Sequence, residues 1–480
     1  MGIPPWAEMY LCLCHGLINP YTTLKTTMTT CPALLIAAPA SGQGKTTVVS
    51  ALARLHTRQG RKVRVFKCGP DFLDPIWHTL ASGSPVYQVD LWMNGEADVR
   101  QRLAEAAQEA DLILVEGVMG LFDGTPSAAD LARRLGIPVL AVIDAGSMAG
   151  TFGALAFGLQ HYQPDLPWAG VLANRVASAG HAEMLRTSVR SPEQWLGAVM
   201  RNTAFTLPER HLGLTMATEV ADAMARLDAA ADALASTPLG QMSLADLQRW
   251  QVNFELPSDL PVSSDGSEAM DVAEGSALHG KTIAVARDAA FCFIYAANLD
   301  CLKQLGAELV FFSPLADAAL PSCDAVWLPG GYPELHAPQL SANTAMRDAL
   351  AHHVAQNKPV WAECGGMMAL YDTLVTTDGE RHAQWGLLPG TVSMQKKLAA
   401  LGPQQLQAKA GTLRGHTFHY STCATQLPAQ RRTSRPHQAP SPEQGEALYQ
   451  QGSIRASYFH AWFASSPAAT AALFATTGEL

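Results

Sequence analysis

The sequence predicts an α/β protein made of two parallel-sheet domains joined by a linker. Three observations carry this prediction. Short apolar runs alternate with longer helical stretches, which is the pattern of βαβ units with right-handed crossovers. A polar segment over 256–276, rich in Ser, Asp, Glu and Pro, divides one such alternation from a second. The length of 480 residues is more than one ordinary hydrophobic core supports.

The first alternation predicts a domain over 31–250. Its expected strands cover 34–38, 63–67, 112–116, 138–144 and 169–174, and helices are expected over 45–59 and 98–109. Residues 1–30 lack the basic start and the long apolar stretch of a secretory signal, so we expect a disordered extension there. Residues 251–279 are expected to form the linker.

The second alternation predicts a domain over 280–470. Its expected strands cover 282–286, 308–313, 325–329 and 359–362, with helices between the first two and between the last two. The polar stretch 430–444 contains several Pro, Ser and Arg residues and is expected to be a surface loop of this domain.

Composition excludes some classes of function. The formal net charge of −9 disfavours nonspecific nucleic-acid binding, which needs a basic surface, but leaves room for an acidic substrate in a locally positive site. No apolar run is long enough to span a bilayer, so no membrane partner is expected. The nine cysteines lack the spacing of a disulfide framework, which favours reduced thiols in a cytoplasmic protein.

A glycine-rich loop between the first expected strand and helix indicates a nucleotide site. Gly42 and Gly44 let backbone N–H groups face phosphate oxygens, and the helix that begins at Lys45 adds its positive end. The Lys45 side chain is placed to reach the β- and γ-phosphates, and the Thr46 hydroxyl to bind Mg²⁺. The commonest form of the loop has glycine where Pro39 stands. The residues expected to bind ATP are Gly42, Gln43, Gly44, Lys45, Thr46 and Thr47.

Four acidic residues follow strands of the same domain. Asp71 and Asp74 come after the second expected strand, and Glu116 and Asp123 come at and after the third. Ligands of an open parallel sheet bind at the carboxyl ends of its strands, so these acids should share a rim with the loop. We expect Asp71 and Glu116 to join Thr46 as Mg²⁺ ligands, and Asp74 and Asp123 to face the substrate. The alternative is that these acids cap the following helices.

A cysteine in the second domain has the setting of a nucleophile. Cys364 follows the expected strand 359–362 and precedes two glycines and a helix, which is the arrangement of a nucleophile elbow. The helix N-terminus is expected to lower the pKa of the thiol. The Gly365 N–H and the Gly331 N–H, at the end of a neighbouring strand, are candidate oxyanion donors. The alternative is a small buried core residue.

A nucleophilic cysteine usually needs a histidine partner. The candidate is His460, which follows a short β-like run, and the competitors on sequence alone are His416 and His419.

These motifs together resemble one family, the cobyrinate a,c-diamide synthases of cobalamin biosynthesis. The resemblance runs from about 34 to 463. The sequence segments that carry the resemblance are 41–46, 69–75, 116–124 and 208–214 in the first half of the chain, and 287–293, 330–335, 362–366 and 414–416 in the second half. It implies a first domain like dethiobiotin synthetase and a second like the class I glutamine amidotransferases.

The resemblance also implies a reaction. The partners would be cobyrinate or a related tetrapyrrole polycarboxylate and L-glutamine, the cofactors ATP and Mg²⁺, and the product an amide at the a and c acetates. An ammonia route between the two sites is implied, and a homodimer is allowed as the quaternary state. The family favours His460 as the activating histidine. Many amidotransferases carry an acid two residues later, where this chain has Trp462, so a Cys–His pair with slower or differently oriented glutamine hydrolysis is expected.

Other interpretations stay open at this point. Hydrogenobyrinate and nickel-sirohydrochlorin a,c-diamide synthases share nearly every motif, whereas the loop fits cobyric acid synthase poorly. A partitioning-type P-loop ATPase is an alternative of another class, but such proteins carry an extra lysine where Ala40 stands and lack the cysteine elbow. A binding protein with an inactive amidotransferase domain is a further alternative.

Overall fold

A computed structural model describes residues 29–210, 213–255 and 277–476. The described residues divide into two compact units, the first over 29–91 and 95–255 and the second over 92–94 and 277–476. Most of the expected extension and of the expected linker lies outside the described residues, as do positions 211–212 of the segment 208–214.

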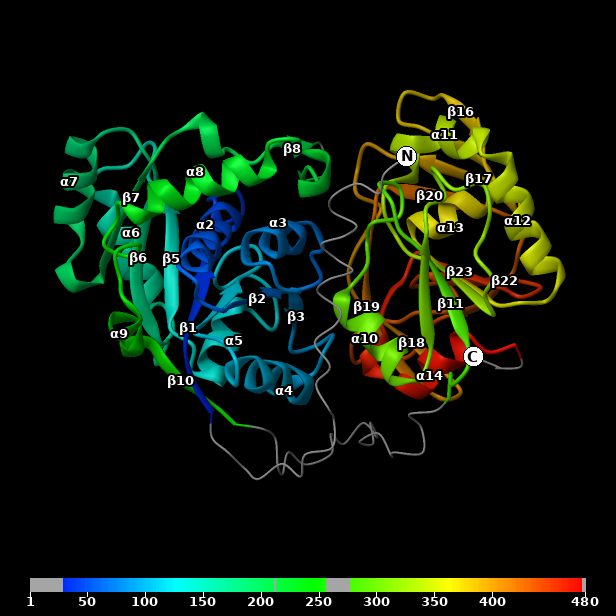
Figure 1. The fold of residues 1–480 in the computed structure, drawn as a ribbon, viewed down its shortest axis with the longest axis horizontal. Helices are drawn as coiled ribbons and strands as arrows, with labels where there is room; N and C mark the ends of the chain where they lie inside the picture. Colours follow the sequence, from blue (N-terminus) through cyan, green and yellow to red (C-terminus); the bar gives the residue numbers. More distant parts are fainter. Residues whose placement is uncertain (1–28, 211–212, 256–276, 477–480) are drawn as a thin grey trace. The chain divides into compact units, whose positions relative to one another are not determined.

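The first unit is a parallel sheet with one antiparallel strand beside it (Figure 1). The parallel strands run in the order β3-β2-β4-β1-β5-β6-β7, and β10 pairs antiparallel with the start of β1. Their bounds are β1 (Thr29–Ala37), β2 (Val63–Cys68), β3 (Tyr87–Val89), β4 (Leu112–Glu116), β5 (Val139–Asp144), β6 (Trp168–Val176), β7 (Trp195–Met200) and β10 (Gln251–Phe254). A separate two-stranded pair is formed by β8 (Glu209–Arg210) and β9 (Gly213–Leu214).

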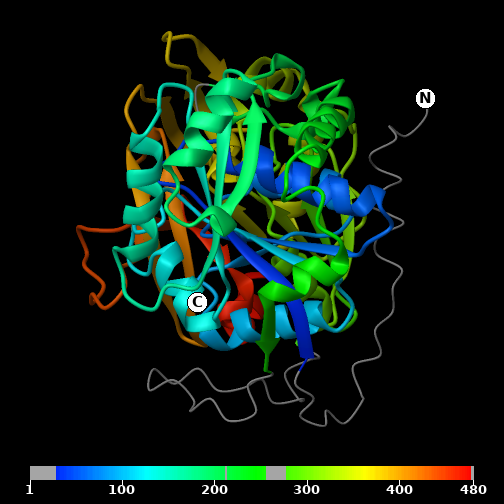
Figure 2. The ribbon, with the colours of Figure 1, turned by 90° about the vertical axis from the view of Figure 1, so that its left-hand side faces the viewer.

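Helices cover both faces of this sheet (Figure 2). One apolar core lies under α2 (Lys45–Arg58), α3 (Leu73–Ser82), α8 (Ala223–Ala235) and α9 (Leu244–Leu247). A second lies under α4 (Glu96–Ala107), α5 (Ala128–Leu135), α6 (Thr151–His161) and α7 (Ala179–Ser188). Because the strands are buried on both faces, they read as continuous apolar runs in the sequence.

The expected limits of the first domain were wrong at both ends. Thr29 and Thr30 belong to β1, and β10 falls within the stretch predicted as linker. Strand β10 was missed because its burial alternates. Val252 and Phe254 enter the core, whereas Gln251 and Asn253 stay exposed.

The second unit holds a seven-stranded sheet in the order β12-β11-β13-β14-β23-β22-β21. The first five strands in this order are parallel to one another. Strand β22 pairs antiparallel with β23, and β21 pairs antiparallel with β22. The bounds are β11 (Thr282–Ala286), β12 (Glu308–Phe312), β13 (Ala325–Leu328), β14 (Val360–Glu363), β21 (Ala429–Arg432), β22 (Ala447–Gln451) and β23 (Ile454–Ser457). Residues 430–432 were predicted to begin a surface loop but belong to strand β21, so the loop prediction was wrong for these residues.

In the described part of this unit, two smaller sheets and five α-helices accompany the large sheet. The small sheets are β16-β15-β17-β20 and β18-β19-β24. Their bounds are β15 (Tyr371–Val375), β16 (Arg381–Ala383), β17 (Leu388–Met394), β18 (Ala400–Ala408), β19 (Gly411–His419), β20 (Ser421–Ala424) and β24 (His460–Trp462). The helices are α10 (Ala296–Gln304), α11 (Ala337–Ala342), α12 (Thr344–Ala355), α13 (Gly365–Leu370) and α14 (Pro467–Leu473). No helix within the described ranges has the length and apolar character needed to cross a bilayer.

Two candidate active sites

The phosphate loop leaves the end of β1 and enters α2, as predicted. Gly42 and Gly44 have φ values of 76° and 91°, a left-handed region that favours glycine. A Cβ at Gly44 would lie 2.1 Å from the Asn174 side-chain nitrogen, so this position also needs glycine for space. The Lys45 ammonium donates to the carbonyls of Ala40 (3.3 Å) and Met119 (2.7 Å), and burial lowers the pKa of this lysine.

The ends of β5 and β6 hold the loop in place. The Gln43 side-chain oxygen accepts from the Asp144 N–H at 2.8 Å, and its carbonyl accepts from the Asn174 amide at 2.9 Å. Arg175 donates to the Gly42 carbonyl at 3.0 Å and to the Asp144 carboxylate at 2.7 Å. Gln43 therefore acts as an anchor of the loop, a role that its place in the sequence did not reveal.

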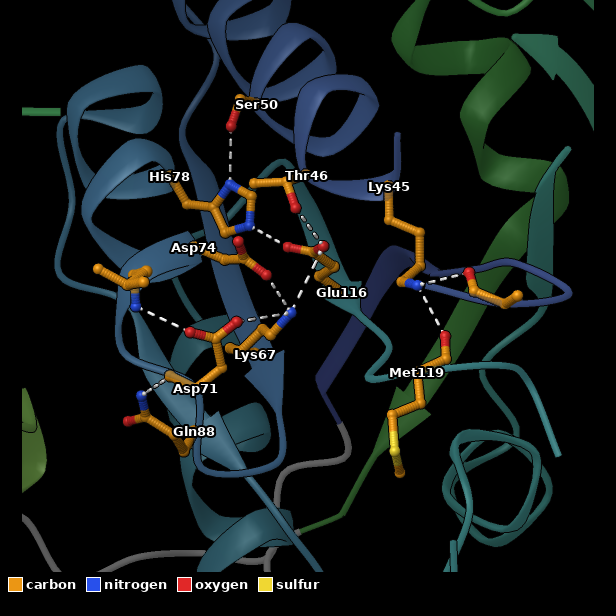
Figure 3. Close-up of polar contacts among 12 residues, drawn as sticks. Lys45, Thr46, Ser50, Lys67, Asp71, Asp74, His78, Gln88, Glu116 and Met119 are labelled. Carbon is orange, nitrogen blue, oxygen red and sulfur yellow. Dashed lines mark hydrogen bonds and ion pairs between the residues drawn. The ribbon is translucent and has the colours of Figure 1, made fainter. Parts of the chain in front are cut away.

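The predicted acids gather around a buried cation at the ends of β2 and β4 (Figure 3). The Lys67 ammonium lies 2.5 Å from Asp74, 3.4 Å from Glu116 and 3.5 Å from Asp71. Burial opposes the charged form, but the three carboxylates outweigh it and raise the pKa of Lys67 well above its usual value. The sequence prediction brought these acids to one rim but missed the lysine.

Asp71 and Asp74 have opposite protonation preferences. Partial burial of a side chain that is 32% exposed, together with the nearby Asp74 carboxylate, raises the pKa of Asp71 above its ordinary value. Burial also acts on Asp74, but the Lys67 ammonium overcomes it and lowers the pKa of that carboxyl. One oxygen of Asp71 accepts from the Leu73 N–H at 2.8 Å, so the capping alternative holds for that oxygen. The other oxygen faces Lys67.

Glu116 is fully buried and uses both of its oxygens. One accepts from the Thr46 hydroxyl at 2.9 Å, and the other is bonded to His78. Two of the three residues predicted to bind Mg²⁺ are thus in direct contact. No group of three or more His, Cys, Asp or Glu residues in the described part of the chain has the geometry of a metal centre. A hydroxyl with one or two carboxylates suits Mg²⁺, which takes its remaining ligands from phosphates and water.

Two other predicted residues have weaker support from the geometry. The Asp123 carboxylate accepts from the Gly120 N–H at 2.8 Å within its own turn, which favours the structural alternative for this residue. Thr47 lies half-buried on the first turn of α2.

In the second unit, Cys364 forms the predicted elbow between β14 and α13. Its φ and ψ of 44° and −106° are unusual for a residue with a side chain, as expected of a nucleophile held on a sharp turn. The Cys364 N–H donates to the Ser457 carbonyl at 2.8 Å, and its carbonyl accepts from the Met368 N–H at 2.9 Å. The elbow is therefore fixed on both sides by backbone bonds.

Glycines let the elbow lie against the end of β13. A Cβ at Gly366 would lie 2.1 Å from the Leu328 carbonyl oxygen, and one at Gly365 would lie 2.9 Å from the Gly331 nitrogen. The two backbone groups predicted as oxyanion donors, at Gly331 and Gly365, are thus neighbours.

The environment of the thiol differs from the prediction. Burial raises the pKa of Cys364, and the Glu334 carboxylate adds to the rise. The Gly365 N–H at the start of α13 does lower the pKa, but burial outweighs it, so the expected net lowering was wrong. Activation of this thiol therefore needs a base or a bound substrate.

The three candidate histidines differ in what their ring nitrogens contact. His419 has one nitrogen 2.8 Å from the Ser421 carbonyl and the other 3.2 Å from Glu446. His416 has its Nδ1 3.3 Å from the Tyr295 hydroxyl. Neither nitrogen of His460 has a hydrogen-bond partner among the described residues, although the ring is buried.

His460 is held by ring packing rather than by hydrogen bonds. Its ring stacks on Phe293 at 4.1 Å and on His416 at 4.9 Å, and a Cβ at Gly330 would lie 2.4 Å from its Cε1. Burial, with a smaller effect of the neighbouring histidines, lowers the pKa of His460 far below its usual value, so the ring is neutral. A neutral imidazole has a lone pair that can accept a proton, but the lowered pKa makes this ring a weaker base than a solvated histidine.

Glu363 connects the cysteine strand to the histidine strand. Its carboxyl accepts from the Trp361 indole N–H at 2.8 Å and from the Ala461 N–H at 3.2 Å. Burial raises the pKa of Glu363 to about 8. Trp462, which stands where many amidotransferases carry an acid, is buried and packs against the Tyr295 ring at 5.3 Å.

Comparison with known families assigns both units. Residues 34–214 match a family model described as the CobQ/CobB/MinD/ParA nucleotide binding domain. Residues 282–468 match one described as the CobB/CobQ-like glutamine amidotransferase domain. A partitioning-type ATPase would account for only the first of these matches.

Relatives match the chain along nearly its whole length. A hydrogenobyrinate a,c-diamide synthase of Pseudomonas aeruginosa is 55% identical and is aligned over 94% of this chain and 98% of its own. A cobyrinate a,c-diamide synthase of Herminiimonas arsenicoxydans is 49% identical over 92% of this chain and 96% of its own. The chain therefore belongs to the family of cobyrinate and hydrogenobyrinate a,c-diamide synthases, amidating ligases that carry a glutamine amidotransferase domain.

Proposed function

We propose that this enzyme converts the a and c acetate carboxylates of hydrogenobyrinate or cobyrinate into amides, using glutamine as the nitrogen source and ATP to activate each carboxylate. The observation that carries the proposal is the presence, in one chain, of a phosphate loop beside an acidic cluster and of a cysteine elbow that packs on the same Gly330–Gly331 turn as His460. Both ring nitrogens of this histidine lack a hydrogen-bond partner among the described residues. The names of the relatives supply the tetrapyrrole.

In the second unit, glutamine hydrolysis would proceed through a thioester. The Cys364 sulfur attacks the side-chain amide carbon of glutamine while His460 takes the thiol proton. The N–H groups of Gly331 and Gly365 stabilise the oxyanion, and His460 returns the proton to the departing ammonia. Water then cleaves the thioester to give glutamate and the free thiol.

In the first unit, the acetate carboxylate would attack the γ-phosphorus of ATP and release ADP. The resulting acyl phosphate has a good leaving group, so ammonia attacks its carbonyl carbon and phosphate departs. Lys45 neutralises charge on the transferring phosphoryl group. Thr46, Glu116 and Asp71 are the residues that would hold Mg²⁺, which when bound neutralises phosphate charge. Asp74 and Asp123 stay predictions as substrate-facing acids.

Two variants test this division of chemistry. Cys364→Ala should lose glutamine-dependent amidation and keep amidation from ammonium salts, because only the nitrogen source is removed. Lys45→Ala should lose amidation from both nitrogen sources. Mass measurement of the products after incubation with hydrogenobyrinate, cobyrinate and nickel-sirohydrochlorin would identify the substrate. Loss of the ammonium-driven reaction in Cys364→Ala would assign that cysteine a structural role and contradict the proposal.

A cytoplasmic location and a homodimer stay predictions from the sequence.

A further inference from the structure

A continuous chain of side-chain hydrogen bonds runs behind the phosphate loop. The Ser50 hydroxyl lies 2.9 Å from Nδ1 of His78, and Nε2 of the same ring is bonded to Oε2 of Glu116. Oε1 of Glu116 accepts from the Thr46 hydroxyl at 2.9 Å. Figure 3 shows the histidine between the serine and the glutamate, with Thr46 bonded to the other oxygen of the glutamate.

The chain follows from the spacing of residues on two helices. Thr46 and Ser50 are four residues apart on α2 and therefore share one face of that helix. Asp74 and His78 have the same spacing on α3. The two helices pack on the same face of the sheet, so each offers a pair of polar side chains to the acids at the strand ends.

Burial makes these contacts specific. Ser50, His78 and Glu116 each have an exposed fraction of 0%. A buried polar group without a partner is costly, so the three groups are confined to the geometry in which all of them are bonded.

The bonds also distinguish the two oxygens of Glu116. Oε2 faces the histidine, whereas Oε1 faces Thr46 and lies 3.4 Å from the Lys67 ammonium. The glutamate cannot rotate about its last bond without breaking the contact to His78. The oxygen that faces the phosphate loop is thereby fixed.

We propose that Ser50 and His78 are positioning residues that hold Glu116 oriented toward the metal of a bound Mg·ATP complex. His78 donates its Nε2–H to Oε2, and the Ser50 hydroxyl donates to Nδ1 and so fixes the tautomer. Partners of this kind orient metal-binding carboxylates, and their removal typically costs about 10- to 100-fold in metal affinity. The inference rests on the proposed role of Glu116 as a metal ligand.

Matched substitutions at His78 separate this role from simple core packing. The amide nitrogen of His78→Gln takes the place of Nε2 and keeps a donor for Glu116, whereas that of His78→Asn takes the place of Nδ1 and leaves Glu116 without its partner. Ser50→Ala removes only the hydroxyl. Ser82→Ala is the control, because the Ser82 hydroxyl is also buried in α3 but bonds the His78 backbone carbonyl at 2.8 Å.

The measurement is the affinity for Mn²⁺ in the presence of a non-hydrolysable ATP analogue, followed by the electron paramagnetic resonance of free Mn²⁺. Affinity for the analogue is measured separately in EDTA. We expect His78→Asn to weaken Mn²⁺ binding by about 10- to 100-fold. His78→Gln and Ser50→Ala should be affected less, and Ser82→Ala should match the wild type. Binding of the analogue in EDTA should change by less than about threefold, because Ser50 and His78 are proposed to affect only the binding of the metal.

Other outcomes would overturn the proposal. Equal Mn²⁺ affinity in His78→Asn and the wild type would do so, as would equal losses with and without metal, which indicate damage to the fold. Ser50→Ala, a small change, keeps the test available if His78→Asn does not fold. Glu116→Gln distinguishes the two levels of inference. If it leaves Mn²⁺ binding intact, the metal site itself is wrong, whereas its loss beside an unaffected His78→Asn rejects only the positioning role.

Discussion

At the scale of single residues, Lys67 determines whether the acidic cluster is stable. It is 3% exposed and is the cation shared by Asp71, Asp74 and Glu116. Removing one partner of a buried ion pair costs about 3 to 5 kcal/mol, because the remaining charge is left uncompensated. We therefore expect Lys67→Met to lower the free energy of unfolding by that amount in EDTA, measured by urea denaturation.

Mg²⁺ should restore part of this loss, since it would supply the missing positive charge and binds the folded state. The control is Lys62→Met, which replaces an exposed lysine just before the same strand. Equal stability of the two variants would show that the Lys67 charge is not needed by the carboxylates.

Glu363 gives a dependence of stability on pH whose sign can be worked out. Its pKa is about 8 in the folded protein and about 4.3 in an unfolded chain. The folded state therefore holds a proton that the unfolded state has lost between these values, so the wild type loses stability as pH rises toward 8. Glu363→Gln keeps an oxygen acceptor for Trp361 and Ala461 but does not ionise.

We expect the stability of Glu363→Gln relative to the wild type to increase steadily from about pH 4.3 to pH 8 and then to level off. Chemical denaturation at several pH values measures this difference. Glu308→Gln, at an exposed glutamate of the same unit, should show no such trend. A difference that is constant with pH would mean that Glu363 ionises at its ordinary pKa.

Residue types and their neighbours in the sequence were enough to place Thr46 and Glu116 together. They were not enough to find Lys67 or His78, because one charged residue in an apolar strand, or a histidine on a helix, has no meaning until its partners are known. Lys67, which stands with Arg64 among the apolar residues of β2, was the available signal. The pKa of Cys364 was predicted in the wrong direction, since the sequence does not reveal how deeply the thiol is buried or that Glu334 lies near it.

At the scale of elements, the central parallel strands were predicted well, whereas the parallel strands β3 and β7 and most antiparallel strands were missed. The expected strands 112–116 and 282–286 coincide with β4 and β11. Both are buried on two faces and so appear as apolar runs. Strand β18 pairs along its whole length with β19, yet only Gln404 and Leu406 are buried, and its first half includes Gly402 and Pro403. Such a strand is defined by its partner rather than by its own sequence.

The elbow element predicts a steric effect at Gly366. An added Cβ would lie 2.1 Å from the backbone oxygen of Leu328, so Gly366→Ala must displace α13 from the end of β13. We expect glutamine-dependent amidation to fall by at least about 100-fold, because a misplacement of about 1 Å is enough for such a loss. Amidation from ammonium should remain near the wild-type rate.

The control for this substitution is Gly158→Ala in α6, where no atom lies within 4 Å of the added Cβ. It should leave both activities unchanged and slightly stabilise the helix. A glutaminase unaffected by Gly366→Ala would show that the elbow tolerates movement and that its close packing is not needed for catalysis.

At the scale of the whole molecule, two α/β units each bring chemistry to the carboxyl ends of parallel strands. The phosphate loop and Glu116 follow β1 and β4, and Cys364 follows β14. Within the described residues, each unit has its own apolar cores. A substitution in one unit should therefore stop one reaction and leave the other intact, and the only species that links the two reactions should be ammonia.

Mixing two inactive variants tests this arrangement. Cys364→Ala should retain the amidating unit and Glu116→Gln the glutaminase unit, so neither alone should amidate the tetrapyrrole from glutamine. A mixture should do so, because ammonia released by one variant reaches the other through solution. With glutamine labelled in its amide nitrogen, added unlabelled ammonium should dilute the label in the mixture more than in the wild type, where ammonia passes within one molecule. If the mixture stays inactive while Glu116→Gln still produces glutamate and Cys364→Ala still uses ammonium, free ammonia is not the species that links the two units.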